Sequence, residues 1–185
     1  MLGQFGAENI QFDVEVFVRA ISDALKQEAP ALSPDEMQAV VMARREQEMQ
    51  AQRARAEDAK AAGEASLAEN GEREGVVTTD SGLQYEVLTE GDGGQPTVKD
   101  TVVVHYRGTL LDGTEFDSSY GRDAPATFPL EGIIKGWQEA LQLMKTGGKW
   151  KVFIPSELAY GASGAGGRIG PHETLIFEIE LLEIK

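Results

Sequence analysis

The chain has 185 residues, 41% hydrophobic and 26% charged, which suffices for one ordinary core plus an extension. Its 31 acidic residues outnumber its 17 Lys and Arg, and the resulting net charge of −14 argues against binding to nucleic acid or to anionic lipid. The absence of cysteine excludes disulfides and thiolate metal sites. No stretch approaches the roughly 18 apolar residues of a membrane-spanning helix, so we expect no membrane span.

The first 32 residues contain an amphipathic pattern. Apolar residues recur at three- and four-residue steps, which predicts a helix with a large apolar face: Phe12, Val16, Phe17, Ile21, Ala24 and Leu25. So short a segment cannot bury that face alone. The face packs either on the C-terminal part of its own chain or on the same segment of a second copy, and the long helix that follows favours a symmetric dimer.

A long helix is predicted to begin at Ser33-Pro34-Asp35-Glu36, where a Ser N-cap, a Pro at the first helical position and a Glu three residues after the cap coincide. No strong breaker follows before Gly63 or the Asn70-Gly71 pair. Apolar residues crowd the first half of this helix, whereas the second half is Ala and charge. We therefore expect residues 33–75 to form a stalk whose second half is solvated.

From residue 76 onward the pattern changes to alternating apolar residues, which predicts strands. The runs centre on 83–88, 102–107, 115–117, 149–154 and 175–182, and a single short amphipathic helix covers 133–144. We predict an α+β fold, in which a twisted antiparallel sheet wraps around that one short helix, preceded by an all-α segment. The expected divisions are 1–32, 33–75 and 76–185.

Several common site types are disfavoured by spacing. The glycines of 161–167 do not follow the dinucleotide-binding pattern and precede a strand, and His105 and His172 lack partners at metal-ligand spacing. No serine lies in a nucleophile motif. We therefore expect no cofactor, no metal and no covalent catalysis.

Five aromatic residues and one acid lie in segments whose patterns turn them toward one interior: Tyr106, Phe116, Asp117, Trp137, Tyr160 and Phe177. For any single aromatic residue, an ordinary core position is the simpler interpretation. Together the six describe an aromatic cup with one carboxylate, suited to a compact apolar ligand such as a proline ring.

The order and spacing of five segments resemble FKBP-type peptidyl-prolyl isomerases over about residues 82–185: Val103–Gly108, Gly113–Ser119, Ile133–Trp137, Ala159–Gly161 and Thr174–Leu182. The resemblance implies that these six residues, with Ile133 and Ile134, line a proline pocket whose floor is Trp137. It implies that the Ile134 amide and the Tyr160 hydroxyl donate hydrogen bonds to a bound peptide or macrolide inhibitor. Other substrate contacts are expected from Phe128, Ala126, Ala165 and Ile169. Ala126 replaces a rim aromatic and Ala165 a loop histidine that many family members have.

The N-terminal part resembles the dimeric FKBPs of Gram-negative bacteria, including the macrophage infectivity potentiator group, through Ala68–Asn70 and Ser81–Tyr85. The resemblance implies a homodimer through the N-terminal helices and a periplasmic or cytoplasmic location. Residues 2–6 resemble the end of a helix that these relatives have in full. We expect isomerisation of proline bonds in unfolded or partly folded polypeptides, with folding-helper activity. The alternative is a non-catalytic proline-binding module or holdase.

Overall fold

The computed structural model describes residues 14–26, 32–122 and 124–185. The chain divides into two compact units, Met1–Gln50 and Ala51–Lys185, and each is described by itself. Within the described residues, no helix combines the length and the apolar composition that crossing a membrane requires.

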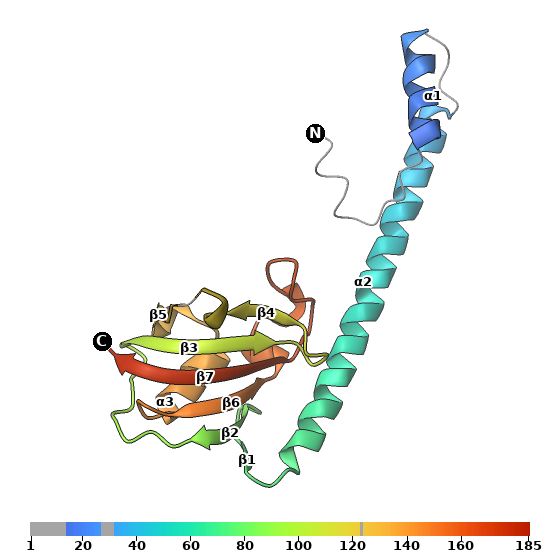
Figure 1. The fold of residues 1–185 in the computed structure, drawn as a ribbon. Coiled ribbons are helices and arrows are strands. Elements are labelled where there is room, and N and C mark those ends of the chain that lie inside the picture. Colours follow the sequence, from blue (N-terminus) through green and yellow to red (C-terminus); the bar gives the residue numbers. More distant parts are fainter. Residues whose placement is uncertain (1–13, 27–31, 123) are drawn as a thin grey trace. The chain divides into compact units, whose positions relative to one another are not determined.

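The N-terminal unit contains helix α1 (Val14–Leu25) and the first part of helix α2 (Pro34–Gly71) (Figure 1). The predicted amphipathic helix is present, although Phe12 and residues 2–6 lie outside the described residues. Its predicted apolar face is exposed: Ile21 and Leu25 are 45% and 81% accessible. The apolar residues of the first half of α2, such as Val40 at 60%, are exposed as well.

The predicted capping box begins α2. The Ser33 amide donates to Glu36 Oε2 at 2.8 Å, and the Glu36 amide donates to Ser33 Oγ at 3.3 Å. These reciprocal bonds satisfy two amides that the first helical turn leaves without a partner. The helix then continues through Gly63 and ends at Gly71.

The prediction of a fully solvated second half of α2 was wrong for one face. Gly63 and Asn70 are buried. Four further residues of this half are half-buried: Ala56, Ala59, Ser66 and Leu67. A Cβ at Gly63 would lie 2.4 Å from Thr174 Oγ1. Asn70 Nδ2 donates to Gln84 Oε1, and Gln84 Nε2 donates to the Leu67 carbonyl, both at 2.8 Å. The helix therefore packs closely at Gly63, where no side chain intervenes, and is held to the sheet by hydrogen bonds of the Asn70 and Gln84 side-chain amides.

The C-terminal unit contains an antiparallel sheet of seven strands among the described residues, in the order β1-β2-β6-β7-β3-β4, with β5 also paired to β3. The strands are β1 (Val76–Thr78), β2 (Gln84–Thr89), β3 (Thr101–Thr109), β4 (Glu115–Ser118), β5 (Ala126–Pro129), β6 (Lys149–Ile154) and β7 (Leu175–Ile184). Helix α3 (Lys135–Leu143) lies against one face of the sheet (Figure 1). The predicted α+β architecture is confirmed.

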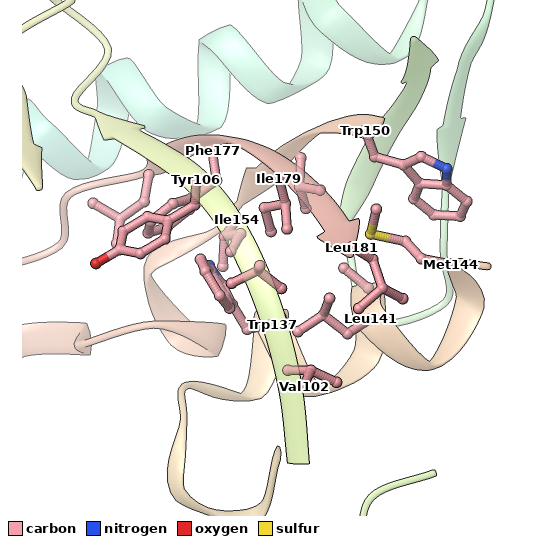
Figure 2. Packing of buried hydrophobic residues seen from close by; sticks show 14 of the residues in the cluster. Val102, Tyr106, Trp137, Leu141, Met144, Trp150, Ile154, Phe177, Ile179 and Leu181 are labelled. Atoms are coloured by element: carbon pink, nitrogen blue, oxygen red, sulfur yellow. The ribbon is translucent and has the colours of Figure 1, made fainter. Parts of the chain in front are cut away.

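The core lies between this sheet and α3. Alternate residues of β3, β6 and β7 face α3, and Figure 2 shows Val102, Ile154 and Ile179 among them, packed with Trp137 and Leu141 of the helix. The two layers approach closely at Gly136, because this residue has no side chain. A Cβ there would lie 2.4 Å from Ile154 Cγ2. This approach places the next residue, Trp137, directly under the sheet.

Candidate active site

One cavity of about 350 Å³ opens beside the N-terminal end of α3. Its volume falls in the range of small-molecule sites. Strands, loops and the helix each contribute to it: Tyr106, Phe116, Asp117, Phe128, Gly132, Ile133, Ile134, Trp137, Tyr160 and Phe177. The structure therefore brings together all six residues of the predicted cup, with Ile133, Ile134 and Phe128.

The aromatic rings of the pocket pack edge to face. The Trp137 ring centroid lies 5.2 Å from those of Tyr106 and Phe177, at interplanar angles of 84° and 85°. Phe116 meets Phe177 at 5.5 Å and 86°. Such pairs favour this geometry because the positive ring edge faces the negative face of its partner. The rings thus hold one another in fixed orientations around the cavity.

Gly108 on β3 is required by two of these rings. A Cβ at this position would lie 2.7 Å from both Phe116 Cζ and Phe177 Cε1. The Phe177 ring has little room to withdraw, since it is 5% exposed and packs against Trp137. The glycine therefore allows the two phenylalanines to meet over the strand.

Asp117 is held by a hydrogen-bonded group at the pocket edge. The Tyr106 hydroxyl donates to Asp117 Oδ2 at 2.5 Å. Arg122 donates to Asp117 Oδ1 through Nη1 at 2.9 Å and to the Tyr106 hydroxyl oxygen through Nη2 at 2.8 Å. The Ser118 amide donates to Asp117 Oδ1 at 2.9 Å. The carboxylate is thus fixed by three donors.

These contacts set the ionisation of the group. Burial disfavours the charge of Asp117, but hydrogen bonds from Tyr106 and Arg122 outweigh it, so the pKa of Asp117 lies below its usual value. Burial, followed by the hydrogen bond to Asp117, raises the pKa of Tyr106. Near neutral pH, Asp117 is therefore a carboxylate and Tyr106 keeps its proton, an arrangement suited to orientation and not to proton transfer.

Two hydrogen-bond donors at the pocket are free to meet a ligand. Within the described residues, neither the main-chain N–H of Ile134 nor the Tyr160 hydroxyl donates to another group of the chain. Ile134 precedes α3 as its N-cap, and its carbonyl already accepts from the Trp137 amide at 3.0 Å. Tyr160 is 40% exposed, so its hydroxyl is accessible at the pocket rim.

Three of the predicted substrate contacts do not line this cavity. Ala126 packs against the core from β5, while Ala165 and Ile169 pair with each other across the glycine-rich loop. Two further residues were not predicted: Gly132, which lines the cavity, and Arg122, which binds Asp117. Arg122 follows Asp117 by five residues in an irregular segment, so no periodic pattern connected the two.

His105 lies outside the aromatic pocket and makes structural contacts. His105 Nδ1 lies 3.0 Å from Ser119 Oγ, and its ring stacks on Tyr120 at 4.9 Å, which anchors the segment after β4. Among the residues that the structure describes, no three potential metal ligands gather.

Family models match nearly the whole chain. Residues 93–182 match the FKBP-type peptidyl-prolyl cis-trans isomerase family, and residues 1–87 match the domain amino terminal to it. The FKBP-type 22 kDa peptidyl-prolyl cis-trans isomerase of Escherichia coli is 48% identical over 92% of this chain and 82% of that protein. The chain belongs to the FKBP-type peptidyl-prolyl cis-trans isomerases.

Other FKBP relatives share both parts of the chain. The outer membrane protein MIP of Legionella longbeachae is 41% identical over 98% of this chain and 79% of that protein. The crystal structure of FkpA from Escherichia coli superposes with a TM-score of 0.78 at 39% identity, over 95% of this chain and 84% of that one. These relatives come from Gram-negative bacteria.

Proposed function

We propose that this FKBP-type isomerase accelerates rotation about X–Pro bonds in the aromatic pocket, by removing water and stabilising a twisted amide. Catalysis belongs to residues 76–185, self-association to 1–32, and spacing to 33–75. The observation that carries this assignment is the enclosure of one cavity by rings from β3, β4, α3 and β7, with two unpaired donors at its edge.

The reaction asks little of acids and bases. Rotation about the bond faces a barrier of roughly 18–20 kcal/mol because the planar amide loses resonance, and the uncatalysed step takes about 10–100 s. In the twisted state the amide has less charge separation, so a dry aromatic environment favours it over the planar ground state. Each tenfold acceleration needs about 1.4 kcal/mol.

Each pocket residue has a role in this scheme. Trp137 is the floor under the prolyl ring, and Phe116 and Phe177 are walls that exclude water. The Ile134 amide and the Tyr160 hydroxyl hold the peptide chain, and Asp117 orients the Tyr106 ring. Ile133 and Phe128 complete the binding surface for the substrate.

Cis-to-trans relaxation of a short Leu-Pro peptide tests the activity. We expect acceleration at micromolar protein, and loss of most of it when Asp117→Ala and Phe177→Ala are combined. Phe153→Ala is the matched control, because Phe153 is an equally buried aromatic (6% exposed) that does not line the pocket. An unaccelerated reaction, with proline peptides still bound, would instead establish the non-catalytic binding module.

The exposed apolar face of α1 supports a homodimer. On that face Ile21 and Leu25 are 45% and 81% accessible, and contiguous exposed apolar surfaces of this kind mark association sites. Two pockets in one dimer would raise the effective concentration of a second proline site on an unfolded chain, which supports a folding-helper role. Sedimentation of the whole chain against residues 51–185 tests this. If both proteins sediment as monomers, the homodimer is refuted.

The ligands follow from the same pocket. Proline-containing segments of unfolded or partly folded polypeptides are the substrates, and macrolide inhibitors of the FKBP class compete for the cavity. Competition is measured as loss of Leu-Pro acceleration with increasing macrolide. Acceleration that persists at saturating macrolide would place catalysis outside the cavity.

A further inference from the structure

A second hollow, the loop groove, lies within the C-terminal unit between α2 and the glycine-rich loop. Its volume is about 600 Å³, larger than the aromatic pocket. Helix α2 supplies Gln52 and Arg55, the loop supplies residues 162–167 and 169–171, and Glu173 completes the wall. The groove exists because α2 packs on the sheet at Gly63 and Asn70.

The glycine-rich loop contributes to both hollows. Tyr160 lines the aromatic pocket and immediately precedes the loop, whose residues Ala165 and Ile169 line the loop groove. Arg168 Nη1 donates to the Phe116 carbonyl at 3.2 Å, which ties the loop to a strand of the aromatic pocket. The glycine-rich loop and the residue before it therefore border both hollows.

The loop presents main-chain groups to that surface. Gly166 and Gly167 adopt φ values of +58° and +70°, with no atom within 4 Å of where a Cβ would stand. Within the described residues, their amides donate to no backbone acceptor. Unpaired main-chain donors beside open space are what an extended peptide needs for main-chain hydrogen bonding.

The charge of the groove favours an acidic segment. Arg55 is exposed and forms no ion pair within the described residues. Glu173 on the opposite wall is the one acid among the described residues that line the groove, and burial, followed by the charge of Asp112, raises its pKa. Because the net charge of the chain is −14, an acidic ligand side chain is attracted only where a cationic side chain lies within direct contact distance.

We propose that the loop groove binds an extended, acidic segment of the same polypeptide whose proline occupies the aromatic pocket. Arg55 pairs with the carboxylate, and the loop amides meet the main chain. This assignment rests on the proposed isomerase function, and it makes the groove a determinant of which prolines are chosen.

The test uses the full chain and two charge reversals. Arg55→Glu changes the groove, and Arg53→Glu is the matched control, since Arg53 is an exposed residue of the same helix that does not line the groove. A tetrapeptide with Leu-Pro and no acid reports on the aromatic pocket alone. Longer peptides carry one Glu at increasing distance from the proline, with Gln or Lys in its place as references.

We expect one spacing at which the Glu peptide has a kcat/KM about twofold to fivefold above its Gln reference, a range typical of a single exposed charge pair. Arg55→Glu should abolish that preference and favour the Lys peptide, whereas Arg53→Glu should retain it. Absence of a preference at every spacing, or equal loss in both variants, would overturn the groove assignment. If the unaltered chain does not accelerate isomerisation of the tetrapeptide, the proposed function is overturned instead.

Discussion

Gly63→Ala tests whether the C-terminal half of α2 packs against Thr174 in solution. In a solvated helix, this change would stabilise the protein by about 1 kcal/mol, because Ala is the better helix former. In the structure, the new Cβ would lie 2.4 Å from Oγ1 of Thr174, which is 3% exposed. Overpacking of this kind costs about 1–3 kcal/mol. We therefore expect net destabilisation of about 1 kcal/mol.

The same change in a Thr174→Ala background tests whether the contact with Thr174 is the cause. Thr174→Ala removes Oγ1 and leaves the Cβ at 3.4 Å, an ordinary contact. In that background Gly63→Ala should become stabilising by about 1 kcal/mol, so the sign reverses across the double-mutant cycle. Ala62→Gly, at an exposed position one residue away, calibrates helix propensity in both backgrounds.

The assay is urea unfolding followed by tryptophan fluorescence, since both tryptophans lie in the C-terminal unit. Equal stabilisation by Gly63→Ala in both backgrounds would show that the helix does not pack on Thr174. That result would also remove the helical wall of the loop groove.

Three further changes probe the pocket and the helix cap. Gly108→Ala should reduce stability by about 1–3 kcal/mol and lower Leu-Pro acceleration, because its Cβ would meet the Phe177 ring; unchanged urea midpoints would contradict this. Asp117→Asn should lower kcat/KM by about tenfold or less, roughly 1.4 kcal/mol, with a flat profile around neutral pH in both proteins, whereas a titrating profile would indicate proton transfer. Because the pKa of Asp117 is lowered by folding, its carboxylate stabilises the folded state fully above about pH 4, and this contribution is lost as the pH falls through the folded pKa. The loss of stability with falling pH, monitored by circular dichroism, should therefore be less steep in Asp117→Asn. Ser33→Ala should cost about 1 kcal/mol of α2 stability by circular dichroism, since the Glu36 amide loses the Ser33 Oγ acceptor, and an unshifted melt would refute the capping role.

Elements with a strong local pattern were predictable from the sequence. The capping box located the start of α2 to the residue, and period-two alternation located β3, β6 and β7. The short strand β5 was not recognised, because Ala126-Thr127-Phe128-Pro129 has no full alternation and pairs only through β3. Here tertiary pairing, not local preference, forms the strand.

The packing of α2 and the role of Arg122 escaped prediction for a different reason. Counting apolar residues finds no burial in a stretch of Ala and charge, yet Gly63 is buried because the lack of a side chain permits close approach. Arg122 meets Asp117 only after a 3₁₀ turn folds the chain back. Patterns detect faces, whereas close approach and turn geometry appear only in three dimensions.

The placement of the two tryptophans gives the protein an internal optical reporter. Trp137 is the pocket floor, while Trp150 stacks on Tyr85 at 4.2 Å, away from the pocket (Figure 2). A ligand that enters the cavity changes the surroundings of one indole and leaves the other as a constant reference. Occupancy of the pocket can therefore be followed in the unlabelled protein, and Trp150→Phe would isolate the signal.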